Sequence, residues 1–324
     1  MSDAPQRQTQ RYIRPKDIDN RATTGQRILW RIESIAWDVI YWYPMKMLPI
    51  ETAAKACAGL MKALGPLTSQ SKTVRRNLRL AFPEWTGEKI ADVARGAWET
   101  MGRVAGELPH LAELQPYVEG ARVEIAGREH VEAIKASGKP AVLIGAHLAN
   151  WEVMSAAICR SLDCEITYRA LNNPHIDKCV SDARYAAGID MLVPKGAGTR
   201  ELMRSLGRGR SVGLMNDQKF NQGVAAPFFG HDAMTAPGAT RLAMKFGVPI
   251  MPLSVLRIGD SRYRVTFHEP FMPETGADET AAIQATVARI NKFYEDRIRE
   301  APEQWFWMHN RWPKEAWIAA GVMD

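Results

Sequence analysis

The chain has 324 residues, of which 46% are hydrophobic and 24% are charged, and its formal net charge is +6. These values are typical of a globular protein and exclude a disordered chain. The modest positive charge favours an acidic partner, such as an anionic lipid, a phosphorylated substrate or an acidic carrier protein. It is too small to indicate nucleic-acid binding, and the sequence contains no nucleic-acid-binding motif.

Residues 1–26 form a polar tail that lacks the apolar core of a secretory signal. Residues 27–43 differ, because helical spacing gathers apolar side chains on one side and Arg27 and Arg31 on the other. Such a helix either lies in a membrane interface or packs on the protein's own core. The apolar face consists of Leu29, Ile32, Ala36, Val39, Ile40 and Tyr43.

A second apolar segment covers residues 45–64, but three lysines interrupt it. No window of about 20 residues lacks charge, so a helix that spans the membrane is not expected. We expect residues 27–118 to form a helical region that associates with a membrane, including a helix over 88–114. A basic cluster in this region either binds anionic lipid or forms a solvated helix face. It consists of Lys72, Arg75, Arg76 and Arg79.

From residue 119 onward, strands alternate with helices. This pattern predicts an α/β domain over 119–324, with a mixed, mostly parallel sheet flanked by helices. Strands are expected at 121–126, 141–146, 165–170, 191–194, 211–216, 248–256 and 263–267. Helices are expected at 151–162, 176–187, 199–206, 236–246 and 280–300.

The block from His147 to Glu152 joins a buried strand to a helix. Residues five apart on one helix point in different directions, so His147 and Glu152 can meet only if the chain bends between them. Asn150 is a suitable N-cap for a helix that begins after the bend. An imidazole held by a carboxylate can take a proton from a hydroxyl. The simpler alternative is a strand-end histidine bonded to backbone, with Glu152 complementing the helix dipole.

Two further polar segments follow predicted strands. Tyr168-Arg169 precedes Asn172, and Asp217-Gln218 follows the strand at 211–216. In open α/β sheets, ligands bind beyond the carboxyl ends of the strands. We therefore expect these residues and His147 to line one cleft, although Arg169 and Asp217 could each also serve a surface ion pair or a loop cap.

The cysteines form no close pair, which favours free thiols in a reducing compartment. His175 and Cys179 lie four residues apart on a predicted helix, but two ligands do not make a metal site, and none is expected. The four cysteines are Cys57, Cys159, Cys164 and Cys179.

Short motifs along most of the chain resemble those of one enzyme family. From about Arg27 to Trp312, the sequence is similar to the bacterial lipid A biosynthesis acyltransferases, the lauroyl/myristoyl-type enzymes of the glycerolipid acyltransferase superfamily. The matching pieces are Arg76-Asn77-Leu78, Ala81-Phe82-Pro83-Glu84, His147 with Asn150-Trp151-Glu152, Tyr168-Arg169, Asn172-Asn173-Pro174, Asp217-Gln218, Pro227-Phe228-Phe229-Gly230, Thr235, Pro302-Glu303-Gln304-Trp305, and Trp307 with His309, Arg311 and Trp312.

The resemblance implies a glycerol-3-phosphate acyltransferase-like fold and an O-acyl transfer without metal or redox cofactor. His147 would be the general base, and Glu152 would orient it and stabilise the imidazolium. Arg169 would hold a phosphate or the developing oxyanion, for which a backbone N–H near Trp151 is another candidate. The substrate-binding residues would be Asn150, Tyr168, Arg169, Asn172, Asp217 and Gln218.

The implied partners are an acyl carrier protein as donor and a Kdo-bearing lipid A precursor as acceptor. The protein would sit peripherally or monotopically on the cytoplasmic face of the inner membrane, whose inner leaflet is anionic. Two alternatives remain open. One is a sibling acyltransferase for another glycolipid or phospholipid, such as a phosphatidylinositol mannoside. The other is a lipid-binding protein with a degenerate acyltransferase fold, against which the intact His147 and Glu152 argue.

Overall fold

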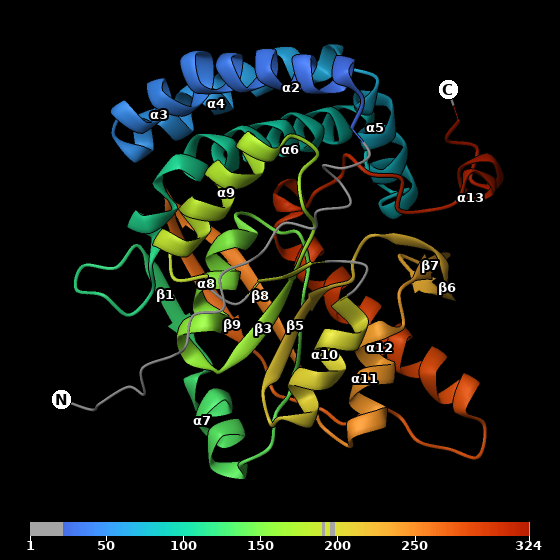
Figure 1. Cartoon of the computed structure of the whole chain (residues 1–324). Helices are drawn as coiled ribbons and strands as arrows, with labels where there is room; N and C mark the ends of the chain where they lie inside the picture. Colours follow the sequence, from blue (N-terminus) through green and yellow to red (C-terminus); the bar gives the residue numbers. More distant parts are fainter. Residues whose placement is uncertain (1–21, 190–191, 195–197, 324) are drawn as a thin grey trace.

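The computed structural model describes residues 22–189, 192–194 and 198–323, which Figure 1 shows as coloured ribbon. Most of the predicted polar tail and the first residue of the strand expected at 191–194 lie outside the described residues. The described chain forms a central sheet, helices on both faces of that sheet, and a layer of N-terminal helices across the top of the view.

The central sheet has seven strands in the order β1-β9-β8-β2-β5-β3-β4. Only the β8–β9 pair is antiparallel, and the other five pairs are parallel. This topology confirms the predicted mixed, mostly parallel sheet. The strands are β1 (Val123–Ala126), β2 (Val142–Gly145), β3 (Cys164–Tyr168), β4 (Leu192–Pro194), β5 (Ser211–Met215), β8 (Ile250–Gly259) and β9 (Arg262–Phe267).

Helices cover the two faces because the chain winds across the sheet in both directions. The connections from β2 to β3 and from β3 to β4 run toward one edge, and those from β4 to β5 and from β5 to β8 run back. Right-handed crossovers in opposite directions place their helices on opposite faces. One face carries α8 (Trp151–Ser161) and α9 (Pro174–Ala186), and the other carries α10 (Gly198–Gly207), α11 (Gly238–Phe246) and α12 (Glu279–Glu300).

The N-terminal layer is built on a close contact between α4 (Ile50–Leu64) and α6 (Gly87–Glu107). Gly102 and Gly106 of α6 face the backbone of α4, where an added Cβ would come within 2.4 Å of the Cys57 carbonyl oxygen and 2.3 Å of the Ala53 carbonyl oxygen. Only glycine allows this approach. The layer is completed by α2 (Thr24–Ala36), a π-helical stretch (Trp37–Trp42), α3 (Tyr43–Met47), α5 (Gln70–Ala81) and a 3₁₀ segment (Leu108–Leu114).

The predicted amphipathic helix over 27–43 is present, but its last part is π-helical rather than α-helical. The wider turn changes the angle between successive residues, so Ile28 and Ile35 join the apolar face that the sequence predicted. This face does not pack on the protein's core. We call it the apolar helix surface, and its side chains are 50–85% exposed: Ile28, Leu29, Ile32, Ile35, Val39, Ile40, Tyr43, Met47, Leu60, Leu64 and Leu67.

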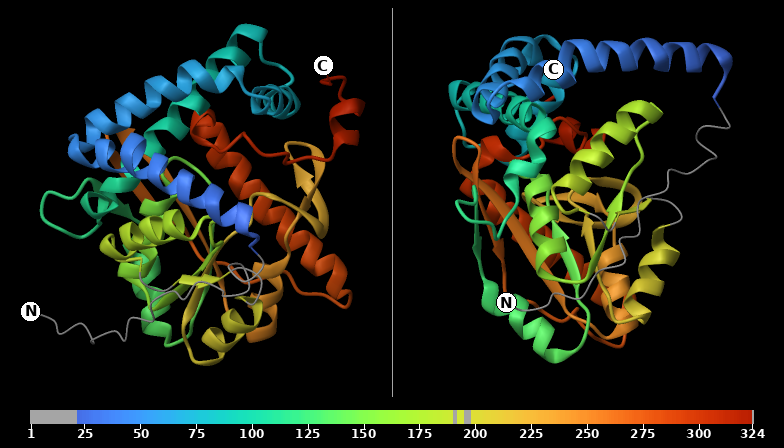
Figure 2. Two further views of the ribbon diagram at one scale, coloured as in Figure 1. Left: turned by 45° about the horizontal axis from the view of Figure 1, so that its top comes forward. Right: turned by 60° about the vertical axis from the view of Figure 1, so that its left-hand side comes forward.

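Within the described residues, no helix is both long and apolar enough to cross a membrane. Figure 2 shows α2 extending along the outer side of the molecule, away from the sheet. The N-cap of α9, Asn173, donates to the Trp30 carbonyl at 2.8 Å. The N-terminal helices therefore contact the helix that follows β3, on the side of the sheet where this strand ends.

Three elements were missed by the sequence prediction. One is a helix after β1, and the other two strands form a separate antiparallel hairpin. The hairpin contacts α12 and turns at Phe229-Gly230, both with positive φ. The missed elements are α7 (Arg128–Ser137), β6 (Lys219–Phe228) and β7 (His231–Thr235). A short helix, α13 (Lys314–Ala319), ends the described fold.

Candidate active site

The three polar segments predicted at strand ends follow three neighbouring strands. His147 follows β2, Asp217 follows β5 and Arg169 follows β3, and β5 lies between the other two in the sheet. Because these strands are parallel, their carboxyl ends lie at one edge. The sequence expectation of a shared edge is therefore met by the topology.

The chain bends between His147 and α8. Ala149 takes the left-handed conformation, with φ of 44°, which is strained for a residue with a Cβ. Its amide donates to the Gln304 carbonyl at 2.7 Å, and the Phe306 amide donates to the His147 carbonyl at 3.0 Å. The C-terminal segment around Trp305 thus fixes the bend from outside, and it forms a β-bridge with Leu148.

The carboxylate that holds His147 is Asp217. Nδ1 of His147 lies 2.7 Å from Oδ1 of Asp217, and the His147 amide donates to Oδ2 at 2.9 Å. Trp305 donates its indole N–H to Oδ2 at 2.8 Å. The Asp217 carboxylate is fully buried. Burial alone would raise its pKa, but the charge and hydrogen bonds of His147, with the charge of His309, hold the pKa well below its usual range.

This arrangement leaves Nε2 of His147 for chemistry. When Nδ1 donates to Asp217, Nε2 carries the lone pair, and no described residue forms a hydrogen bond with it. The side chain is 20% exposed and lines the main cavity. An imidazole oriented by a buried carboxylate is the usual construction of a general base.

Glu152 has a different partner from the one expected. Its two carboxylate oxygens accept hydrogen bonds from Nε and Nη2 of Arg184 at 2.9 and 2.5 Å. The Arg184 guanidinium also lies over the Tyr168 ring, 4.5 Å from its centroid. Glu152 lines the same cavity as His147, but in the described structure the imidazole is oriented by Asp217. The expected Glu152 contact to the imidazole is thus replaced by a nearly buried ion pair between α8 and α9.

A cavity of about 470 Å³ opens at this edge of the sheet. Polar groups from the three strand ends lie on one part of its wall, and aliphatic side chains from β3, α9, α10 and β5 form much of the rest. The polar lining includes His147, Glu152, Arg169, Arg184, Asn216 and Gln218. The apolar lining includes Ile166, Leu171, Val180, Ile189, Leu202 and Leu214.

Of the predicted substrate-binding residues, Tyr168, Arg169 and Gln218 line the cavity. Arg169 is exposed, whereas Tyr168 is largely buried and its hydroxyl donates to Asp177. Asn172 is exposed and is not part of the cavity wall described above. Asp217 is buried beneath His147, so it orients the base and cannot reach a substrate directly.

Asn150 is also a structural residue rather than a substrate ligand. It is fully buried, and its side-chain oxygen accepts from the Glu152 amide at 3.2 Å, which confirms the predicted N-cap. Its amide nitrogen donates to Glu107 at 3.0 Å. Burial would raise the pKa of Glu107, but the ion pair with Arg257 and a hydrogen bond from Tyr263 lower it. Asn150 thus ties the start of α8 to a buried charge.

Two residues of the site were not predicted. Arg184 carried no motif, because a lone arginine on a helix gives no sign of its partner. Trp305 belonged to the Pro302-Glu303-Gln304-Trp305 motif, but its contact with Asp217 depends on a chain separation of 88 residues. Only the fold reveals it.

Comparisons with known proteins agree with this site. The family described as bacterial lipid A biosynthesis acyltransferase matches the chain over residues 26–314. The lipid A biosynthesis lauroyltransferase of Escherichia coli K12 is 26% identical over 293 residues, which is 89% of each chain. The palmitoleoyltransferase of the same strain is 24% identical, covering 76% of this chain and 79% of the relative.

Two further similarities extend beyond these enzymes. A phosphatidylinositol mannoside acyltransferase of Mycolicibacterium smegmatis is 21% identical over 277 residues, which is 84% of this chain and 88% of the relative. Among solved structures, the 1-acyl-sn-glycerophosphate acyltransferase of Thermotoga maritima has a TM-score of only 0.36 at 13% identity. That match covers 76% of this chain and 98% of the other.

Proposed function

Because the chain belongs to the bacterial lipid A biosynthesis acyltransferase family, we propose that it transfers an acyl chain from an acyl carrier protein thioester to a hydroxyl of a Kdo-bearing lipid A precursor. The observation that supports this most directly is the hydrogen bond between His147 and buried Asp217 at the mouth of a partly apolar cavity. This step would be a late acylation in lipid A biosynthesis.

The reaction begins when Nε2 of His147 takes the proton of the acceptor hydroxyl. The hydroxyl oxygen attacks the thioester carbonyl and forms a tetrahedral intermediate. This intermediate collapses to the ester, the carbon–sulfur bond breaks, and the imidazolium returns its proton to the departing thiolate. Asp217 stabilises the imidazolium, since its carboxylate remains ionised.

The negative charge of the intermediate needs a partner in the cavity. Arg169 lies at the cavity wall and is exposed, so its guanidinium can reach either this oxyanion or a phosphate of the acceptor. The start of α8 beside Trp151 offers backbone N–H groups as a second candidate. Glu152 and Arg184 shape the wall between these groups and hold α8 against α9.

The acyl chain of the donor would occupy the aliphatic part of the cavity. Val180 and Leu202 come from two helices on opposite faces of the sheet, and Ile166 comes from β3 between them. Burial of each methylene in such a wall contributes about 0.8 kcal/mol. The depth of this wall would therefore set which chain length is transferred.

The N-terminal helical region, residues 27–118, would hold the enzyme at the membrane. The apolar helix surface is exposed, and Lys72, Arg75 and Arg79 are exposed on the neighbouring α5. Apolar burial together with attraction to anionic lipid is how interfacial helices bind membranes. The acceptor is a lipid, so we propose attachment to the cytoplasmic face of the inner membrane, where acyl carrier protein is available.

An in-vitro assay tests the proposal. The purified protein is supplied with acyl carrier protein thioester and a Kdo-bearing lipid A precursor, and the product is identified by mass spectrometry. We expect one added acyl chain, and none with His147→Ala. The relative that acts on phosphatidylinositol mannoside matches over a similar length, so the assay includes this acceptor. Transfer to the mannoside but not to the lipid A precursor would reassign the acceptor.

A further inference from the structure

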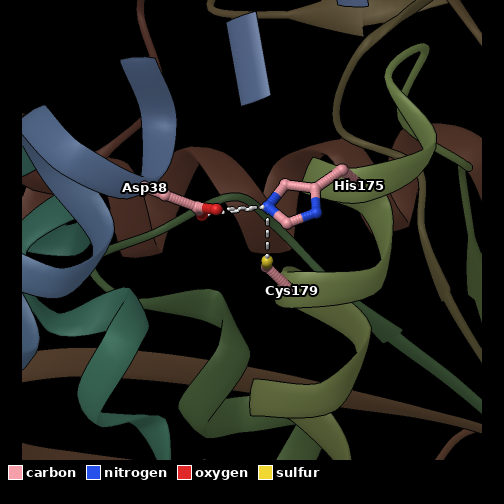
Figure 3. Close-up of side chains that lie close together, drawn as sticks. All are labelled: Asp38, His175 and Cys179. Carbon is pink, nitrogen blue, oxygen red and sulfur yellow. Dashed lines mark hydrogen bonds and ion pairs between the residues drawn. The ribbon is translucent and has the colours of Figure 1, made fainter. Parts of the chain in front are cut away.

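Three side chains with different metal-ligating atoms meet between the N-terminal helices and α9 (Figure 3). Asp38 comes from the π-helical stretch, and His175 and Cys179 come from successive turns of α9. Their ligand atoms all lie within 4.8 Å of one another. The side chains of Asp38 and His175 are 24% and 42% exposed, so an ion can reach them from solvent.

The distances suit a small tetrahedral ion. Nε2 of His175 lies 2.8 Å from an Asp38 oxygen and 3.7 Å from Sγ of Cys179. In a tetrahedral zinc site, bond lengths of about 2.1 Å to nitrogen and 2.3 Å to sulfur separate these two ligand atoms by about 3.5 Å. The histidine and cysteine already have this separation. The carboxylate would need to move outward by only roughly half an ångström.

We propose that Asp38, His175 and Cys179 form a binding site for a thiophilic divalent cation, Zn²⁺ in particular. A thiolate and an imidazole favour zinc, whereas Mg²⁺ and Ca²⁺ take oxygen ligands. Three protein ligands leave the fourth tetrahedral position to water. The i, i+4 spacing of His175 and Cys179 puts both on one face of α9, and Asp38 approaches that face from the other helix.

Binding exchanges protons but involves no redox change. Cys179 releases its thiol proton to solvent and binds as the thiolate. The neutral His175 imidazole binds through Nε2, so its remaining proton resides on Nδ1. The metal then takes the place of the proton that lies between Nε2 and the Asp38 carboxylate in the metal-free protein.

The site would join the membrane-facing helices to the cavity wall. Outside the cluster, Asn173 links α9 to α2 through hydrogen bonds to the Trp30 carbonyl and to Glu33. The same α9 carries Val180 and Arg184 of the cavity wall. A bound ion would therefore restrict the movement of α9 relative to α2, which these hydrogen bonds alone limit less firmly.

Metal titration tests the site without any acyl-transfer assay. Protein without an affinity tag is freed of metal with a chelator, kept reduced and titrated with Zn²⁺ by calorimetry and with Co²⁺ by absorption. We expect one equivalent, with the ligand-field bands of tetrahedral cobalt and a thiolate-to-cobalt band. Cys179→Ser and His175→Gln should each weaken binding by at least about tenfold. Asp182→Asn, an exposed change on the same helix, should bind like the wild type.

Hydrogen exchange tests the link between the helices. With saturating Zn²⁺, amides in residues 24–36 and 174–186 should exchange more slowly in the wild-type protein and in Asp182→Asn, but not in Cys179→Ser. Circular dichroism of the metal-free variants verifies that they are folded. The site is disproved if the wild-type protein binds no cobalt, or if both ligand variants bind it equally well. Binding through Cys179 without slower exchange would overturn the proposed restriction of α9.

Discussion

His147 and Asp217, 70 residues apart in the chain, form a hydrogen bond of 2.7 Å between Nδ1 and Oδ1. Their strands, β2 and β5, are neighbours in the sheet, so the two loops that follow them meet directly. Asp217 also accepts hydrogen bonds from the His147 amide and the Trp305 indole. The carboxylate thereby fixes both the backbone and the ring of the proposed base.

We predict that Asp217→Asn lowers kcat by about 10²–10⁴-fold. An amide has the same shape, but it cannot stabilise an imidazolium and can favour the wrong tautomer of His147. Initial rates with acyl carrier protein thioester measure the effect, and a thermal melt verifies folding. A turnover within twofold of the wild type would remove Asp217 from the mechanism.

Glu152→Gln and Arg184→Gln should each destabilise the protein by about 3 kcal/mol, because each leaves the other member of a nearly buried ion pair without its partner. The double variant should lose less than the sum of the two, since it leaves no unpaired charge. Urea denaturation gives the three free energies of unfolding. We also expect Glu152→Gln to retain a small part of the acyl-transfer activity, unlike His147→Ala. Additive losses of stability would show that the two side chains act independently.

The sequence predicted the sheet edge because strand periodicity and strand-end residues are local signals. It placed His147 and Asp217 at this edge but assigned the orienting role to Glu152, which is nearer in sequence. Pairing of residues 70 apart depends on strand order, and periodicity carries no information about that order. The preference for a nearby carboxylate reversed the roles of the two acids.

The missed hairpin has a local cause. Its two-residue turn, Phe229-Gly230, has positive φ at both positions, a conformation for which Asn-Gly or Asp-Gly is the usual signal. Phenylalanine at the first position conceals that signal. It is tolerated here because the Phe229 ring is buried and its amide donates to Glu295 at 2.7 Å. Tertiary contacts therefore compensate a backbone conformation that local propensity disfavours.

Arg169→Lys should lower kcat/KM by about 10–100-fold. The planar guanidinium forms two parallel hydrogen bonds to a phosphate or oxyanion, which a lysine cannot reproduce. A change mainly in KM for the lipid acceptor would indicate a phosphate contact, and a change in kcat would indicate the oxyanion. Arg262→Ala, an exposed arginine on β9, serves as the control. Unchanged constants in Arg169→Ala would place Arg169 outside the site.

The unfolding free energy should fall as pH decreases from about 6.5 to 4. Burial lowers the pKa of His309 from 6.5 to about 4, so in this window the unfolded chain binds a proton that the folded protein does not. The shift corresponds to at most about 3 kcal/mol. His309→Gln should reduce the pH dependence but not remove it, because burial also lowers the pKa of His268 to about 4. An unchanged slope in His309→Gln, measured by urea denaturation at several pH values, would contradict this assignment.

Replacing Ile32 and Ile40 by aspartate should release the protein from anionic liposomes. Both side chains are more than 60% exposed on the apolar helix surface, so the change introduces charge at the membrane without disturbing the core. Activity should fall on acceptor presented in a membrane and fall less on acceptor dispersed in detergent. The matched control, Ala281→Asp with Ala285→Asp, adds the same two charges to exposed positions of α12 and should stay bound. Equal losses in both assays would mean that the helix contributes to folding rather than to attachment. Full liposome binding by the Ile32→Asp, Ile40→Asp variant would shift the anchor to residues 45–64 or to the basic cluster on α5.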